Sequence, residues 1–271
     1  MDKVQTIGFI GGGMMAGAIL DGMVHRMKKN PAELFVSECR QERCCELNAL
    51  YGVTAKTTAD SFIGKVDAVL FAVKPQALDA ALEEIAPKVK PGARIISIVA
   101  GVPVARFEKA FPGHPIVRVM PNTPLSVGEG MSAYTLNAAA EAVSDTTAEE
   151  IFSSCGRAVK VTESLMDAVT GLSGSGPAYA FLMIDALSDG GVMAGLPRDN
   201  ARIMAAQTLL GAAKMVLETE KHPDVLRDAV TSPAGTTIAG VRVMEQQGVR
   251  GALIDAVMAA TKRSEELGKL K

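Results

Sequence analysis

A glycine-rich turn near the start of the chain constrains the fold more than any other segment. Residues 4–10 contain Val, Ile and Phe, the spacing GxGxxA follows at Gly11, Gly13 and Ala16, and residues 14–27 have helical periodicity. Gly11 lets the chain turn tightly out of a strand, Gly13 lets a pyrophosphate approach the backbone, and Ala16 lets the helix pack closely on the strand. The segment therefore predicts a strand–turn–helix unit.

The rest of the first 163 residues repeats this alternation. Runs rich in Val, Ile or Phe predict strands, and segments with helical spacing lie between them. The predicted strands are 4–10, 33–37, 68–73, 94–99, 116–120, 131–134 and 157–161, and the predicted helices are 14–27, 40–51, 76–89 and 144–155. Strands that are apolar on both faces are typical of a parallel sheet covered by helices. We expect an α/β fold with a Rossmann-like, doubly wound sheet in residues 1–163, as a dinucleotide-binding domain.

The sequence changes character after residue 163, where good helix formers dominate. Residues 164–271 are expected to form an all-α domain, with helices at 177–194, 198–219, 236–247 and 251–267. The helix 198–219 carries Ile203, Leu210 and Leu217 at a spacing of seven, and alanines lie on its polar face too. A helix this apolar needs partners on more than one side. We therefore expect a dimer interface here, and the core of a monomeric bundle is the alternative.

Composition and charge exclude several classes of protein. The 271 residues are 48% hydrophobic, which is enough to bury a sizeable core and argues against a disordered chain. With 28 basic and 30 acidic residues and no basic stripe, no nucleic-acid partner is expected. The apolar runs 68–73 and 95–105 are shorter than the about 20 residues of a membrane span, so no membrane association is expected.

Targeting signals and metal-binding patterns are also missing from the sequence. No signal-peptide pattern follows the first residues, the four cysteines form no CxxC pair, and the three histidines stand apart. These features predict a cytoplasmic protein with reduced cysteines and no metal site.

The glycine turn, within a series of strands and helices, indicates dinucleotide binding. Free amides at the start of the following helix would hold the pyrophosphate. A turn that serves only packing is the alternative. The second predicted strand ends at Glu38, followed by Arg40 and Arg43. A carboxylate there favours NAD and an arginine favours NADP, so these residues alone leave the cofactor open.

Further candidate ligand segments lie at strand ends and helix starts. Segments 71–75, 97–101 and 119–124 end predicted strands, where ligands of open α/β sheets bind. Segments 171–177 and 231–237 interrupt the helical part. The latter offers hydroxyls and free amides at a helix start, which suits a small carboxylate, although simple N-capping is the alternative. The sequence shows no nucleophilic triad. An enzyme that transfers hydride needs none, because the cofactor supplies the reactive group.

Five ordered motifs resemble those of pyrroline-5-carboxylate reductases over nearly the whole chain. They are Gly8–Gly11, Ala72–Pro75, Met120–Pro124, Ser173–Tyr179 and Ser232–Thr237. The resemblance implies reduction of the cyclic imine 1-pyrroline-5-carboxylate to L-proline, the last step of proline biosynthesis, with NADPH or NADH. It also implies a homodimer formed through the helical domains, and often a ring of such dimers.

The motifs and the resemblance together assign site residues. Those expected to hold NADPH or NADH are Ile10, Gly11, Gly12, Gly13, Met14, Met15, Glu38, Arg40, Ala72, Val73, Lys74, Pro75, Ile98, Val99 and Ala100. Those expected to hold the substrate are Glu163, Ser232, Gly235, Thr236 and Thr237. Thr237 matches the threonine whose hydroxyl lies near the ring nitrogen in that family, and it is the expected catalytic residue.

Two residues depart from the family's usual pattern. Glu38 stands where Ser, Thr or Asn is common beside the 2′-phosphate of NADPH, and its carboxylate would repel that phosphate unless Arg40 or Arg43 compensates. Ala234 replaces a more usual glycine in the substrate loop. We expect both cofactors to be used, with NADH favoured.

Two other functions fit parts of the sequence. The β-hydroxyacid dehydrogenases resemble it at Gly171, Gly174 and Gly176, but Ala180 stands where their motif GxxGxGxxxK has lysine. Without that acid/base group their reaction would slow by about 10²–10⁴. A dinucleotide-binding regulator without catalysis would not need the loop at 232–237.

Overall fold

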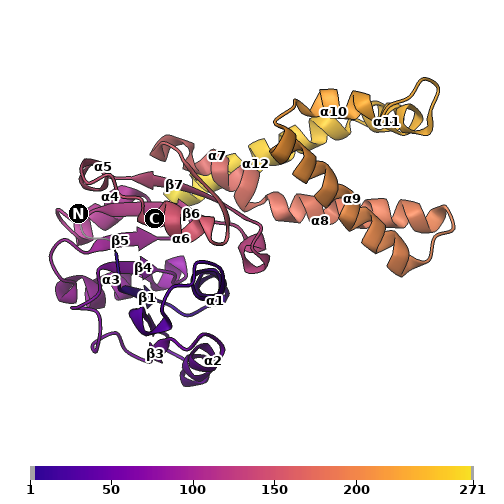
Figure 1. The fold of residues 1–271 in the computed structure, drawn as a ribbon. Coiled ribbons are helices and arrows are strands. Elements are labelled where there is room, and N and C mark those ends of the chain that lie inside the picture. The colour runs from indigo at the N-terminus through magenta and orange to yellow at the C-terminus, as the bar shows by residue number, and fades with distance from the viewer. Residues whose placement is uncertain (1–3, 270–271) are drawn as a thin grey trace. The chain divides into compact units, whose positions relative to one another are not determined.

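The computed structural model describes residues 4–269, of which Lys269 is described by its backbone only. The chain forms two compact units (Figure 1), one of Met1–Gly174 with Ala260–Lys271 and one of Ser175–Ala259. The domain boundary predicted after residue 163 does not coincide with these units and remains a prediction. No helix in the described part of the chain is long and apolar enough to span a membrane.

The first unit is built on an eight-stranded sheet in the order β3-β2-β1-β4-β5-β6-β7-β8. The strands are β1 (Ile7–Ile10), β2 (Leu34–Ser37), β3 (Thr54–Lys56), β4 (Ala68–Phe71), β5 (Arg94–Ser97), β6 (Ile116–Met120), β7 (Gly130–Leu136) and β8 (Gly156–Lys160). β1 to β6 are parallel, β7 runs antiparallel to β6, and β8 is parallel to β7. The order of β1 to β6 is that of doubly wound dinucleotide-binding sheets, so the predicted fold class is confirmed.

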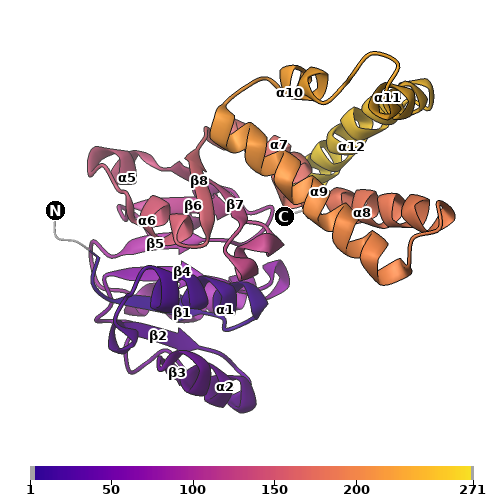
Figure 2. The same ribbon diagram turned by 45° about the vertical axis from the view of Figure 1, so that its right-hand side comes forward.

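Helices cover both faces of this sheet. The α-helices that lie wholly in this unit are α1 (Met14–Asp21), α2 (Gln41–Tyr51), α3 (Leu78–Ile85), α4 (Val104–Ala110), α5 (Ala138–Ala142), α6 (Thr147–Ser153) and α7 (Met166–Val169). α1, α2 and α6 pack on one face (Figure 2), and α3 and α4 pack on the other. Successive strand residues alternate between the two cores: Phe9 and Leu70 enter one, and Ile10 and Phe71 enter the other. Burial on both faces explains why these strands are continuously apolar.

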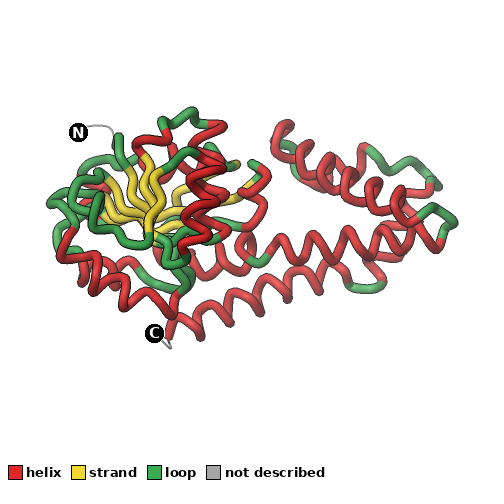
Figure 3. The backbone as a smooth tube through the Cα atoms, turned by 90° about the horizontal axis from the view of Figure 1, so that it is seen from below, coloured by secondary structure: helices red, strands yellow, loops and turns green. Residues whose placement is uncertain are grey.

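The second unit contains only helices and loops among its described residues (Figure 3). The helices are α8 (Gly176–Met193), α9 (Arg198–Thr219), α10 (Pro223–Ala229), α11 (Thr236–Gln246) and α12 (Val249–Lys269), whose last turns belong to the first unit. Many large apolar side chains of this unit are exposed, among them Phe181, Leu182, Met193, Ile203, Met204, Leu210, Leu217, Ile254 and Met258. Such a concentration of exposed apolar surface is typical of an interaction face.

Several elements differ from their predicted bounds. The elements that were not predicted are β3, α4, α5, α7 and α10. β1 begins at Ile7 rather than Val4, and β4 and β5 end at Phe71 and Ser97 rather than Val73 and Val99. The first helix is α-helical only to Asp21 and continues as a π-helical turn, Gly22–Arg26. At Gly22 a side chain would collide with the Cys155 sulfur, because the helix packs there directly against the segment before β8.

Candidate cofactor and substrate sites

The glycine turn leaves β1 in a conformation that requires glycine. Gly11 has a φ of +99°, and a Cβ there would lie 2.7 Å from the carbonyl oxygen of Ala72. The Gly11 amide donates to the Ser37 carbonyl over 2.8 Å, which ties the turn to the end of β2. Glycine is therefore required at position 11 both by the backbone conformation and by the close approach of the backbone that follows the adjacent strand β4.

Open space lies over the start of α1. Gly13 is the N-cap residue, no side chain caps the helix, and a Cβ at Gly13 would meet nothing within 4 Å. The amides of the first turn therefore have no side-chain acceptor, and together with the helix dipole they form a site suited to an anion.

The three segments predicted to hold the cofactor lie side by side at one edge of the sheet. They follow β1, β4 and β5, which are adjacent and parallel, so Ile10–Met15, Ala72–Pro75 and Ile98–Ala100 leave the sheet at its carboxyl edge. Hydrogen bonds from the Ala72 amide to the Ile10 carbonyl (2.8 Å) and from the Ile98 amide to the Phe71 carbonyl (3.0 Å) hold these strand ends together. This edge, where the order of strands reverses, is where doubly wound folds bind ligands.

Glu38 lies at the same edge and is held from two sides. Its side chain is 8% exposed; Oε2 accepts from the Gly12 amide over 3.1 Å, and Oε1 accepts from the amide and Nε of Arg40 over 3.2 and 3.0 Å. Burial alone would raise the pKa of Glu38, but the bonds from Arg40 and Gly12 outweigh it and hold the pKa of this carboxyl below its usual value. The group beside the glycine turn is therefore a fixed carboxylate.

The two arginines near Glu38 already have partners. Arg40 pairs with Glu38 and its side chain is otherwise exposed. Arg43 donates from Nε to the Gly12 carbonyl over 2.9 Å and pairs with Glu46 over 2.9 Å. A phosphate at this edge would share these guanidinium groups with their present partners, because each group keeps N–H donors that these contacts do not use.

Glu163, predicted as a substrate residue, lies just after β8 and has partners in the first unit. Its Oε1 pairs with Arg118 of β6 over 2.6 Å and accepts from the Val104 amide over 3.2 Å. Arg118 was not identified from the sequence, although a cation within the apolar run Ile116–Met120 was a usable signal.

The predicted substrate loop belongs to the second unit. Gly235 is the N-cap residue of α11, and no side chain caps this helix. The first amides of α11 thus lack a side-chain acceptor, so the alternative that Ser232 or Thr236 serves as an N-cap is wrong. Thr236 and Thr237 are the first two residues of the helix.

Backbone strain marks the same loop. Ala234 has a φ of +56°, a left-handed conformation that is easy for glycine and costs other residues of order 1 kcal/mol. The Gly235 amide donates to the Ser232 carbonyl over 3.0 Å and closes the turn. Strained turns of this kind are common where backbone amides are aimed at a ligand.

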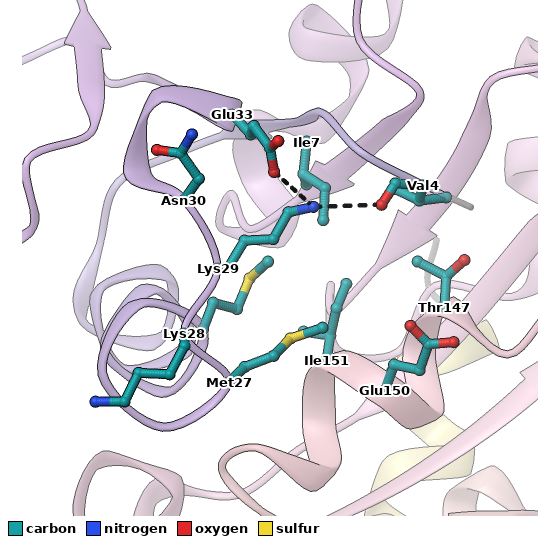
Figure 4. Close-up of a pocket in the computed structure, with 11 residues that line it drawn as sticks. Val4, Ile7, Met27, Lys28, Lys29, Asn30, Glu33, Thr147, Glu150 and Ile151 are labelled. Atoms are coloured by element: carbon teal, nitrogen blue, oxygen red, sulfur yellow. Dashed lines mark hydrogen bonds and ion pairs between the residues drawn. The ribbon is translucent and has the colours of Figure 1, made fainter. Parts of the chain in front are cut away.

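A separate pocket of about 240 Å³ lies toward the amino end of β1, away from the predicted site residues (Figure 4). Met23, Met27 and Ile151 supply apolar lining, and the charged groups Lys28, Lys29, Glu33 and Glu150 line it too. The Lys29 amine is engaged by Glu33 over 2.8 Å and by the Val4 carbonyl over 3.4 Å. None of the residues predicted to hold cofactor or substrate lines this pocket. Among residues 4–268 no cluster of His, Cys, Asp or Glu could hold a metal ion.

Comparison with known proteins agrees with these features. A family model described as "Pyrroline-5-carboxylate reductase dimerisation" matches residues 163–267, and one described as "NADP oxidoreductase coenzyme F420-dependent" matches residues 6–101. A pyrroline-5-carboxylate reductase from Synechocystis is 49% identical over 266 residues, which cover 97% of this chain and 98% of the relative. The chain belongs to the pyrroline-5-carboxylate reductase family. A relative of that name from Methanosarcina acetivorans is 44% identical over 98% of both chains.

Solved structures of pyrroline-5-carboxylate reductases share the whole fold. The enzyme from Coxiella burnetii superposes with a TM-score of 0.92 at 34% identity, covering 98% of this chain and 99% of that one. The Plasmodium falciparum enzyme, whose structure has NADP bound, gives a TM-score of 0.85 at 30% identity over 99% of both chains. The family resemblance predicted from the five motifs is confirmed, and neither the β-hydroxyacid dehydrogenase nor the regulator alternative is supported.

Proposed function

We propose that this protein reduces 1-pyrroline-5-carboxylate to L-proline by hydride transfer from NADH or NADPH, the last step of proline biosynthesis. The observation that carries the proposal is the presence of two uncapped helix starts, at Gly13 and Gly235, in a chain whose whole length matches this family. One would hold the cofactor's pyrophosphate and the other the substrate's carboxylate.

The reaction needs positioning more than acid/base chemistry. When the nicotinamide cofactor is bound it supplies the hydride, which adds to the imine carbon while the nitrogen gains a proton. The α11 amides near Gly235–Thr237 would hold the substrate carboxylate, and this would orient the C=N bond for attack. The Thr237 hydroxyl would hydrogen-bond the ring nitrogen. Its own high pKa makes it a poor proton donor, so the imine is best reduced as the protonated iminium.

For the cofactor we propose that NADH is used at least as well as NADPH. A 2′-phosphate beside the Glu38 carboxylate would place two negative groups close together, at a cost of order 1–3 kcal/mol. The ribose hydroxyls of NADH would instead donate to that carboxylate. Arg40 and Arg43 oppose this preference through the guanidinium N–H donors that Glu38, the Gly12 carbonyl and Glu46 do not occupy.

For the assembly we propose a homodimer formed through residues 164–271, with residues 1–163 binding the cofactor, and dimers joined into a larger ring. The match of residues 163–267 to a dimerisation model and the exposed apolar side chains of α8, α9 and α12 support the dimer. A cytoplasmic location stays a prediction from the sequence.

The direct test is a kinetic assay with both cofactors. Purified protein should oxidise NADH and NADPH only when 1-pyrroline-5-carboxylate is added, and proline should form in equal amount. Size-exclusion chromatography with light scattering on the same sample would give the oligomeric state. Cofactor binding without imine-dependent oxidation would refute the proposed activity, and a monomer at micromolar concentration would refute the proposed dimer.

A further inference from the structure

Arg118 is a charged residue in the interior of the first unit. It is the third residue of β6, lies between Ser97 of β5 and Thr135 of β7, and is 8% exposed. It points to the same face as Ile116, which packs in the core beneath α4. Burying a guanidinium is costly unless a carboxylate compensates it, and Glu163 is that carboxylate.

Glu163 connects Arg118 to the start of α4. The same oxygen, Oε1, contacts Nη1 of Arg118 at 2.6 Å and the Val104 amide at 3.2 Å. The other oxygen, Oε2, is buried and has no hydrogen-bond partner among residues 4–268. The position of this carboxylate, and through it that of the Val104 amide, therefore depends on Arg118.

Val104 is the first residue of α4, directly after the loop that leaves the carboxyl edge of β5. This loop, residues 98–103, includes three of the predicted cofactor residues, and Gly101 within it has a φ of +68°. A cavity of about 410 Å³ borders it, lined by Gly101, Pro103, Arg118, Asp167, Glu265 and Gly268. Val99 and Val102 anchor the loop in the core, but the loop lacks close packing on the side of the cavity, so its position there depends on the contact at its α4 end.

We propose that Arg118 is a positioning residue: acting through Glu163, it fixes the loop from β5 to α4 that faces the nicotinamide half of the cofactor. The inference rests on the proposed function only in assigning that half to the β4–β5 side of the sheet. The adenosine half is held at β1 and β2, by the glycine turn and Glu38, and does not depend on this pair.

The test compares two ligands that differ only in the nicotinamide half. Dissociation constants of NADH and of ADP-ribose are measured by calorimetry for the wild type, Arg118→Met, Glu163→Gln and the double variant. Each single change should raise the Kd of NADH by about tenfold and change that of ADP-ribose less than about twofold. The double variant should be no worse than either single one, because both act through one contact. Arg118→Lys, which keeps the charge, should recover most of the NADH affinity.

A second buried pair in the same sheet provides the control. Arg94, the first residue of β5, pairs with Asp145 over 3.3 Å, with side chains 12% and 1% exposed. Arg94→Met should lower Tm as Arg118→Met does, but it should leave both dissociation constants unchanged because it lies at the opposite end of β5. Loss of either ion pair would then lower Tm, and only loss of the Arg118–Glu163 pair would weaken binding of the nicotinamide half.

Three results would overturn the inference. If NADH and ADP-ribose binding weaken equally, the pair has only a structural role. If NADH affinity is unchanged, the loop does not need the pair for support. If the losses add in the double variant, Arg118 and Glu163 act independently. If Arg118→Met fails to fold, Glu163→Gln and Arg118→Lys still decide the question. Failure of wild-type protein to reduce the imine would count against the proposed function alone, because these binding measurements need no imine.

Discussion

The Glu38 carboxylate accepts a hydrogen bond from the backbone amide of Gly12, with 3.1 Å between Oε2 and N. This bond joins the end of β2 to the glycine turn that follows β1. Arg40 holds the other oxygen, so the carboxylate is restrained from both sides. An adenosine ribose bound at this edge would therefore meet a negative charge that cannot easily move away.

Replacing Glu38 should change the choice of cofactor. In Glu38→Ser the repulsion is lost, and Arg40 is released to contact a 2′-phosphate. The ratio of kcat/KM for NADPH to that for NADH should rise by about tenfold, which corresponds to about 1.4 kcal/mol. Steady-state kinetics with saturating imine would measure it. If the wild type already prefers NADPH and Glu38→Ser leaves the ratio unchanged, the arginines, and not Glu38, determine the choice of cofactor.

The preference should also depend on pH. Because the pKa of Glu38 is held below its usual value of 4.5, this carboxylate stays ionised from pH 5.5 to 8. The 2′-phosphate loses its second charge near pH 6, so its repulsion by Glu38 weakens as the pH falls. The NADPH/NADH ratio of kcat/KM should therefore rise between pH 8 and 5.5, and effects of pH on the imine cancel in the ratio. In Glu38→Gln the rise should disappear; if it persists, its source is another group.

Two adjacent glycines should respond differently to a larger side chain. A Cβ at Gly13 meets nothing within 4 Å, whereas one at Gly12 would lie 2.7 Å from Leu47 Cδ1 and 3.0 Å from Glu38 Cβ. Gly13→Val should keep the wild-type Tm and abolish NADH binding, because the side chain fills the space needed by the pyrophosphate. Gly12→Val should lower Tm as well. Thermal melts and NADH titrations would separate these outcomes, and normal NADH binding by folded Gly13→Val would exclude the turn from the site.

Thr237 should matter for the imine and not for the cofactor. Thr237→Val keeps the volume and removes the hydroxyl, so kcat/KM for the imine should fall about tenfold, as expected for one lost hydrogen bond of about 1–2 kcal/mol. The Kd of NADH should barely change. Thr237→Ser, which retains the hydroxyl, should recover most of the activity. Wild-type kinetics in Thr237→Val would mean that Thr237 has only a structural role in the first turn of α11.

The strands and long helices could be predicted because their signals are local. β6 (Ile116–Met120) and α9 (Arg198–Thr219) have the predicted bounds, since each is an unbroken pattern between turn residues. β3 has only three residues, Thr54–Lys56, and is too short to show a pattern. α4 was missed because Val102 and Val104 extend the apolar run of β5, although Pro103 between them is the N-cap residue of this helix.

The contacts within the candidate site could be predicted only in part. The residues beside the glycine turn follow from strand order, and Glu38 was placed correctly at the end of β2. Its bond to Gly12 joins residues 26 positions apart, and the Arg118–Glu163 pair joins residues 45 apart. Side-chain orientation over such separations depends on the packed sheet, and no local pattern in the sequence encodes it.

Transfer of isotope tests the central claim most directly. The imine is reduced in ordinary water with NADH carrying deuterium at both positions of nicotinamide C4, and the proline is analysed by mass spectrometry and NMR. We predict one deuterium per proline, on the ring carbon that was the imine carbon, with NAD⁺ formed in equal amount. Proline without deuterium, or oxidation of NADH without proline, would contradict direct hydride transfer to 1-pyrroline-5-carboxylate.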